Sequence, residues 1–310
     1  MRVVFWGTPQ LADTTLSALI AAGHDLVGVV TQPDRPAGRG RKMQPPPVKL
    51  TAEEAGIPVL QPEKPWGDEF MTAFRALEPD ITVVAAYGHI LKPEVLELPP
   101  LGSFNVHASL LPKLRGAAPV NWAIIRGHAE TGVTIMRMVE KLDAGPMILQ
   151  AGVEIAARTT AGALYAELAE LGARTLLDAL PLIEAGEVTE EAQDEAEATY
   201  APKLTADDVR LDWSLTGQEL DRWIRGCDPV PGCWTELDGA RVRVFSPCTT
   251  DETAKAEPGV VVSADPRAGL VVATGSELLR VGEVQPAGKR RMEAVEWIRG
   301  RGVMQGARFG

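Results

Sequence analysis

Two polar side chains, Asn105 and His107, stand two positions apart in a mostly apolar stretch of the chain. Residues 103–107 have the pattern of a short buried strand, and side chains two apart on a strand leave it on the same face. An amide and an imidazole together supply two hydrogen-bond donors, which can hold an oxygen that gains negative charge when a carbonyl is attacked. The pair therefore predicts acyl-transfer chemistry.

An acidic residue, Asp143, follows in the turn LDAGP at residues 142–146, after a strand pattern at residues 133–139. Taken alone, an aspartate in a turn with glycine and proline is typical of a turn-forming side chain. Taken together with Asn105 and His107, its carboxylate supplies the base that such chemistry needs. The sequence leaves both interpretations open.

The elements that must position these residues alternate between apolar runs and amphipathic stretches. The strand patterns lie at residues 2–6, 26–31, 57–60, 81–86 and 103–107, and helical patterns lie between them at residues 11–22, 51–55 and 70–77. Such alternation predicts an α/β fold with a doubly wound, mostly parallel sheet. In these sheets the ligand site lies at the carboxyl ends of the strands. His107 is placed at such an end.

Composition restricts the function further. The 310 residues suffice for two domains, and 31 basic against 42 acidic residues give a net charge of -11, which argues against indiscriminate coating of nucleic acid. No apolar run approaches the roughly 18 residues of a membrane span, and the first residues lack a signal-peptide pattern, so we expect a cytoplasmic protein without membrane contact. The three cysteines, Cys227, Cys233 and Cys248, lack metal-binding spacing and predict free thiols and no metal.

The second half of the chain has a different character. Residues 184–197 contain seven acids and no base, which favours a solvated linker. After it, short strand patterns at residues 232–237, 241–246, 259–263, 269–273 and 278–284 predict a small, OB-like β-barrel, a shape often used to hold oligonucleotides. We therefore expect a catalytic domain at residues 1–185, a linker at 186–206 and a barrel domain at 207–310.

A specific resemblance carries these observations further. The string NVHASLLPKLRGAAPVNWAI, followed by LDAGP, resembles the catalytic signature of the folate-dependent formyltransferases. The similarity extends through VVFWGTP, TQPDRPAGRGRKMQPPPVK, YAPKLTADDVRLDW and PAGKRRMEAVEWIRGRG, and so covers essentially the whole chain. The resemblance implies transfer of a formyl group from 10-formyltetrahydrofolate, as co-substrate, to an amino group.

The resemblance also assigns roles to particular positions. Asn105, His107 and Asp143 match the catalytic positions of the family. Binding of the reduced folate is implied for a loop and for the end of a strand, at Ser109, Leu110, Leu111, Pro112, Tyr87 and Gly88. The assignment of Tyr87 and Gly88 to the pterin pocket is the looser one, since it rests on position at a strand end alone.

Two local basic clusters bear on the amino acceptor. One lies after a strand and includes Arg35, Arg39, Arg41 and Lys42; the other lies near the end of the sequence and includes Lys289, Arg290 and Arg291, with Lys203 beside the linker. A solvated loop is the ordinary interpretation of such a run, but beside a catalytic cleft it suits contact with phosphates. Together with the barrel pattern, the two basic clusters favour tRNA binding. The family resemblance then implies that the acceptor is initiator methionyl-tRNA and that the protein acts in translation initiation. We expect the protein to be a monomer.

Other functions remain open from the sequence. A formyltransferase acting on an amino-sugar nucleotide would share the three catalytic positions but would not need the basic clusters. A non-catalytic RNA-binding protein would not need Asn105, His107 and Asp143. A dehydrogenase would need a glycine-rich dinucleotide turn, and the first turn, Gly7-Thr8-Pro9, lacks the GxGxxG pattern.

Overall fold

The computed structural model describes residues 1–37, 40 and 42–310. Within this part of the chain, the contacts divide the protein into two compact units. The N-terminal unit contains Met1–Pro119, Glu130–Glu154 and Tyr165–Ala201, and the C-terminal unit contains Val120–Ala129, Ile155–Leu164 and Pro202–Gly310. This grouping differs from the contiguous ranges expected from the sequence, because two short segments of the first half pack with the second half. Residues 186–201, expected as a linker, belong to the N-terminal unit.

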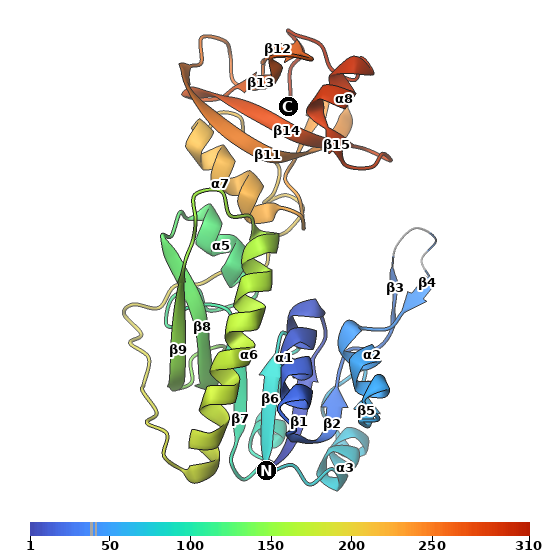
Figure 1. Ribbon diagram of the computed structural model, residues 1–310, viewed down its shortest axis with the longest axis vertical. Helices are drawn as coiled ribbons and strands as arrows, with labels where there is room; N and C mark the ends of the chain where they lie inside the picture. Colours follow the sequence, from blue (N-terminus) through green and yellow to red (C-terminus); the bar gives the residue numbers. More distant parts are fainter. Residues whose placement is uncertain (38–39, 41) are drawn as a thin grey trace. The chain divides into compact units, whose positions relative to one another are not determined.

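The N-terminal unit is built on a sheet with the strand order β5-β2-β1-β6-β7-β8-β9 (Figure 1). Its strands are β1 (Arg2–Gly7), β2 (Asp25–Val30), β5 (Val59–Leu60), β6 (Ile81–Ala85), β7 (Ser103–His107), β8 (Glu130–Arg137) and β9 (Met147–Glu154). The pairings from β5 to β7 are parallel, and β8 and β9 join antiparallel at one edge. The predicted α/β fold with a mostly parallel sheet is confirmed.

Helices and a small hairpin connect these strands, and a long helix, α6, follows the last of them. They are α1 (Gln10–Ala21), α2 (Pro47–Glu54), α3 (Asp68–Ala76), α4 (Pro93–Leu96), α5 (Pro119–Ile125), α6 (Ala161–Ala185) and the hairpin of β3 (Arg35–Ala37) with β4 (Lys42–Gln44). The helix α2 begins earlier than its hydrophobic pattern predicts. Proline suits the first helical turn, because its missing N–H would have no partner there in any case.

Packing of α6 against the sheet decides which face of β7 can carry chemistry. Gly172 of α6 lies so close to β7 that a Cβ at this position would be 2.8 Å from Cγ1 of Val106. Val106 alternates with Asn105 and His107 along the strand, so its side chain leaves the opposite face. Covering of this face by α6 therefore leaves Asn105 and His107 to point to the other side.

An aromatic cluster packs where β1 and β6 end. Trp6 of β1 is fully buried and makes edge contacts with Phe70, Phe74 and Tyr87, at ring centroid distances of 5.6, 5.5 and 5.0 Å. Edge contacts of this kind add to the free energy gained by burying the rings. The cluster joins α3 to the carboxyl ends of these strands and fixes the segment that follows β6.

The C-terminal unit contains an antiparallel sheet in the order β10-β11-β14-β13-β12, with β15 paired to β14. Its elements are α7 (Gly217–Cys227), β10 (Trp234–Leu237), β11 (Ala240–Thr253), β12 (Val261–Asp265), β13 (Gly269–Ala273), β14 (Glu277–Pro286), β15 (Met292–Glu293) and α8 (Ala294–Arg299). These strands agree with the short strand patterns expected in the second domain.

The last residues of the chain connect the two ends of this sheet. Backbone hydrogen bonds join Val261 to Ala307 and Gly259 to Phe309 beside β12, and a reciprocal pair joins Gly310 to Glu236 of β10. Residues 307–310 thereby lie along both end strands, which gives the sheet its barrel character. The Phe309 ring stacks on Trp213 with a centroid distance of 5.6 Å, so this closing segment is anchored in the core of the unit.

The sequence predicts no membrane-spanning segment. Among the residues that the structure describes, no helix combines the length and the apolar composition that crossing a membrane requires.

Candidate active site

Asn105 and His107 lie on β7, inside the sheet between β6 and β8. In the pairing with β8, Asn105 lies opposite Met136 and His107 lies opposite Thr134. His107 is buried, whereas Asn105 is partly exposed. As far as the described residues go, the Asn105 amide makes no hydrogen bond inside the protein, so it is available to a ligand.

The imidazole of His107 contacts two loops. Its Nε2 lies 3.1 Å from the backbone oxygen of Leu114, and its Nδ1 lies 3.8 Å from Oδ2 of Asp143. A carbonyl oxygen only accepts hydrogen bonds, so Nε2 carries a hydrogen and Nδ1 is the nitrogen that faces Asp143. The distance of 3.8 Å is too long for a direct hydrogen bond. It leaves the histidine and the carboxylate close enough to interact electrostatically and to share a bridging group.

The backbone around Asp143 fixes its carboxylate. Asp143 adopts a left-handed conformation with φ 48°, and its Oδ2 accepts a 2.8 Å hydrogen bond from the N–H of Gly116. Gly116 has φ 115°, and a Cβ there would lie 2.8 Å from the backbone oxygen of Ala201. Glycine alone fits this close approach without strain. The carboxylate that faces His107 is therefore aimed by backbone geometry.

The acid-rich segment lies beside this loop. The Gln193 side chain donates from Nε2 to the backbone oxygens of Asp143 and Gly145, at 2.9 and 2.7 Å. Its Oε1 accepts a 2.9 Å hydrogen bond from Nε of Arg115, whose side chain is fully buried. Glu195 completes the group, with Oε1 3.1 Å from Nη1 and from Nη2 of Arg115. A solvated linker was expected here because of like-charge repulsion, but basic partners neutralise part of the charge.

Arg115 and Gln193 were not among the site residues predicted from the sequence. A signal was present, since Arg115 stands in an apolar stretch, LRGAAP, and a buried guanidinium requires acidic or carbonyl acceptors. The segment at residues 184–197 carries many such acceptors. No local pattern shows that the two segments meet, because their partners are distant in the chain.

The loop expected to bind folate has a well-defined backbone. The Ser109 hydroxyl donates to the oxygen of Lys113 at 2.6 Å, while Thr134 Oγ1 donates to the oxygen of Ser109 and accepts from the N–H of Leu111. Gln150 donates to the oxygen of Leu111 at 2.9 Å. Ser109 and Leu111 are buried, and Leu110 and Pro112 are partly exposed. The first pair thus shapes the loop, and the second pair offers surface to a ligand.

Tyr87 and Gly88 follow β6 at its carboxyl end. The Tyr87 side chain is buried against Trp6, and burial raises the pKa of its hydroxyl. In the described part of the chain, this hydroxyl has no hydrogen-bond partner. The backbone oxygen of Tyr87 accepts from Thr8 and Gln32, and Gly88 is exposed with φ 91°. The strand end therefore combines an unsatisfied buried hydroxyl with an open glycine.

The residues expected to contact tRNA have different environments. Arg39 and Arg41 lie outside the described residues. Lys42 on β4, Lys203 and Lys289 are exposed. Arg290 is exposed and pairs with Glu296 at 3.2 Å. Arg291 is instead held inside the C-terminal unit by ion pairs to Asp228 and Glu283, both at 2.6 Å.

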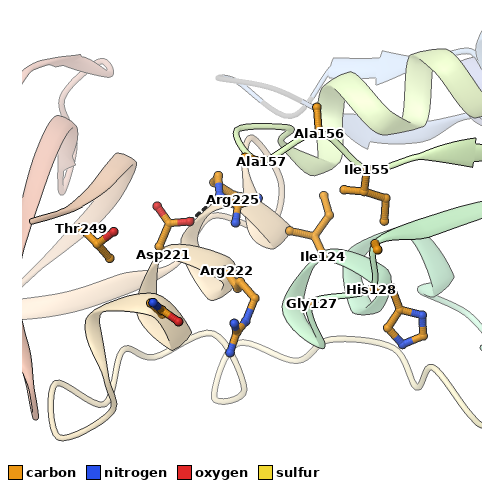
Figure 2. A pocket seen from close by; sticks show the side chains of 12 residues that line it. Ile124, Gly127, His128, Ile155, Ala156, Ala157, Asp221, Arg222, Arg225 and Thr249 are labelled. Atoms are coloured by element: carbon orange, nitrogen blue, oxygen red, sulfur yellow. Dashed lines mark hydrogen bonds and ion pairs between the residues drawn. The ribbon is translucent and has the colours of Figure 1, made fainter. Parts of the chain in front are cut away.

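A cavity of about 330 Å³ lies in the C-terminal unit (Figure 2). Asp221 and Arg225 form an ion pair of 2.6 Å at one side, and Arg158 also pairs with Asp221. Arg222 passes over Gly127, where a Cβ would lie 3.1 Å from its Cδ. The residues lining this cavity include none of those predicted from the sequence for catalysis or binding.

The cysteines are free thiols, as their spacing predicted. Cys227 and Cys233 are buried, and Cys248 is exposed. Burial raises the pKa of Cys233, so its thiol stays protonated. Within residues 1–37, 40 and 42–310, no cluster of three or more His, Cys, Asp or Glu side chains is arranged to hold a metal ion.

Two models of protein families match this chain. The family model described as formyl transferase matches residues 1–180, and the one described as formyl transferase, C-terminal domain, matches residues 203–302. These two matches include Asn105, His107 and Asp143 in the first range and the antiparallel sheet in the second.

Individual relatives are similar over nearly the whole chain. A methionyl-tRNA formyltransferase of Desulfotalea psychrophila is 49% identical over 97% of this chain and 93% of its own length. A methionyl-tRNA formyltransferase of Bacillus licheniformis is 47% identical over 100% of this chain and 98% of its own length. The crystal structure of HypX from Aquifex aeolicus in complex with tetrahydrofolic acid has a TM-score of 0.69 at 19% identity, over 98% of this chain and 48% of that one, and so shares the fold. The chain therefore belongs to the formyl transferase family, as an enzyme with both the catalytic and the C-terminal domain of that family.

Proposed function

We propose that this enzyme transfers the formyl group of 10-formyltetrahydrofolate to the amino group of initiator methionyl-tRNA. The observation that carries the proposal is the approach of His107 Nδ1 to Asp143 Oδ2, at 3.8 Å, at the end of the strand that also presents Asn105. Relatives with 45–49% identity named methionyl-tRNA formyltransferase supply the acceptor.

The residues present fit a reduced folate as co-substrate. Leu110 and Pro112 offer partly exposed apolar surface on a loop whose backbone is held by internal hydrogen bonds. The buried Tyr87 hydroxyl, without a partner in the portion of the chain described here, is the kind of group that a polar ligand satisfies. When bound, the folate supplies the formyl group and the nitrogen that leaves.

Stabilisation of charge is the first task of the side chains. The methionyl amine attacks the formyl carbon as the neutral base, and the formyl oxygen gains negative charge. Asn105 donates from its free amide, and His107 donates from Nδ1, because Nε2 is occupied by the oxygen of Leu114. Donation from both ring nitrogens uses the imidazolium form, and the Asp143 carboxylate lies 3.8 Å from Nδ1, where it can balance that charge. Each donor of this kind is worth about 3 kcal/mol in the barrier.

Proton movement is the second task. The amine must lose a proton once the new carbon–nitrogen bond forms, and the folate nitrogen must gain one as its bond to the formyl carbon breaks. The Asp143 carboxylate is 13% exposed and lies beside His107, so it can accept the first proton directly or through a water molecule. The same pair can return a proton to the leaving nitrogen.

The choice of acceptor is supported by the C-terminal unit as well as by the relatives. An amino-sugar nucleotide would not need the exposed Lys203 and Lys289. Exposed lysines and a small barrel-like sheet suit a large polyanion whose backbone is followed by charge. Translation initiation, in the cytoplasm, is the process that this acceptor implies.

The test is direct formyl transfer. The protein is incubated with 10-formyltetrahydrofolate that is labelled in the formyl group and with methionyl initiator tRNA, elongator tRNA or an amino-sugar nucleotide. Label on the methionyl ester of the initiator tRNA is expected, with little on the other acceptors. Label on the sugar nucleotide alone would replace the proposed acceptor, and no label on any acceptor would contradict the proposed chemistry.

A further inference from the structure

We propose that Gln193 is a positioning residue for the carboxylate of Asp143 in formyl transfer, and that buried Arg115 holds Gln193 in its working orientation. The inference rests on the proposed function, since it concerns the rate of that reaction. It assigns a role to the segment at residues 184–197 that its acidic composition does not suggest.

The orientation of the Gln193 amide follows from the chemistry of its partners. Arg115 has only donors, so the amide oxygen must face its Nε. The backbone oxygens of Asp143 and Gly145 are only acceptors, so the amide nitrogen must face them. A flipped amide would place its N–H groups against the Arg115 donor and its oxygen against the two backbone oxygens, so all three hydrogen bonds would be lost. The amide therefore has one satisfied orientation, in which both of its N–H groups hold the turn of Asp143.

Arg115 anchors this amide in the protein. The side chain of Arg115 is fully buried, and Glu195 is its charged partner. Its backbone is fixed too, because its N–H donates to Thr199 and its oxygen accepts from Ala201. Lys141 pairs with the second oxygen of Glu195 at 2.7 Å. Residues 193–201 thus contact Arg115 through both side chains and backbone.

The side chain and the backbone of Asp143 are both held by residues next to Arg115. Gly116, which follows Arg115 in the chain, donates to the carboxylate, and Gln193 holds the backbone oxygen of the same residue. Asp143 itself has a left-handed backbone, which is less stable than an extended or helical one for a residue with a side chain. Loss of the amide would free the turn to relax and would change the distance between Asp143 and His107.

Two substitutions of Gln193 separate positioning from stability. Gln193→Glu keeps an acceptor for Arg115 but replaces both N–H donors with an oxygen that faces two carbonyl oxygens. Gln193→Met keeps the size and removes every hydrogen bond. A displacement of the order of 1 Å at a reacting group costs up to about 100-fold in rate. We expect both variants to lower kcat by about 10- to 100-fold, with KM for folate and for tRNA within about twofold of wild type.

The readouts are kcat, both KM values and Tm, measured on the full chain. Glu190→Gln is the matched control, because it weakens the ion pair of the same segment with Arg137 and leaves the Asp143 turn untouched; its kcat should equal that of wild type. A purely structural role predicts instead a lower Tm while kcat of the folded protein stays at the wild-type value. Wild-type kcat in a folded Gln193→Glu or Gln193→Met protein, or an equal loss in Glu190→Gln, would overturn the inference. Absence of formyl transfer by the wild type would instead reject the proposed function.

Discussion

Replacement of Asp143 with asparagine removes one charge from the active site and leaves its shape in place. Asparagine has nearly the same size, and its side-chain oxygen can still accept the hydrogen bond from Gly116. The backbone at this position has φ 48°, and asparagine tolerates that left-handed conformation as well as aspartate does. We therefore expect Asp143→Asn to fold with wild-type stability.

The size of the effect follows from the role of Asp143 as the proton acceptor beside His107. Its Oδ2 lies 3.8 Å from Nδ1 of His107, and the two side chains are 6% and 13% exposed, so bulk water has little access to replace it as the base. A positioned general base contributes about 100- to 10,000-fold to a rate. We therefore expect kcat to fall by about 1000-fold. KM values should change little, because the proton moves only after both substrates have bound.

The assay is single-turnover formyl transfer with saturating 10-formyltetrahydrofolate and methionyl initiator tRNA, followed by thermal unfolding of the same sample. Asp194→Asn provides the matched control, since it makes the same chemical change at an exposed carboxylate whose partner is the N–H of Ala196. A variant Asp143→Asn that keeps its Tm and turns over within about tenfold of wild type would refute the assignment of Asp143 as the base.

Three further predictions concern other parts of the molecule. The kcat/KM for tRNA should fall steeply with added salt, while the affinity for folate stays constant. The double variant Lys203→Gln, Lys289→Gln should reduce the slope of log kcat/KM against log salt concentration by about one for each phosphate that is no longer neutralised. Equal salt dependence for both substrates would contradict phosphate binding by these lysines. Gly116→Ala should lower both kcat and Tm, because the new Cβ would clash with the backbone oxygen of Ala201 and because the backbone at this position has φ 115°. Unchanged kcat and Tm would show that the backbone around residue 116 can shift without cost. Thr216→Ala should lower the free energy of unfolding by about 1 kcal/mol in denaturant titrations, because it removes the reciprocal cap with Glu219 at the start of α7. Activity should not change. No loss of stability would mean that water replaces the hydrogen bonds of the cap.

Much of the sheet could be predicted from the sequence, because each strand has a clear local pattern. The pattern at residues 103–107 predicted β7 with the bounds that the structure has, and the turn after the strand at residues 133–139 placed Asp143 beyond the next strand. Periodicity of side chains is a local property, so the face shared by Asn105 and His107 could be inferred without knowing any partner.

Other features depend on contacts between distant segments, and local patterns do not contain them. The seven acids at residues 184–197 predicted a solvated connection, since like charges repel. The structure pairs Glu190 with Arg137 and Glu195 with Arg115 and Lys141, and so places the segment in the N-terminal unit. The same limit applies to Arg291, whose position in a basic run predicted exposure, although Asp228 and Glu283 hold it.

Closure of the C-terminal sheet by residues 307–310 has a consequence for how this unit forms during synthesis. Trp234 of β10 already pairs with residues 209 and 211, but Glu236 of β10 and Val261 of β12 gain their partners from Gly310 and Ala307. These parts of the two strands stay uncovered until residues 307–310 have been made. Uncovered strand edges are templates for pairing with other chains. A chain that lacks residues 307–310 would therefore present two uncovered strand edges, and we expect aggregation to be its main defect.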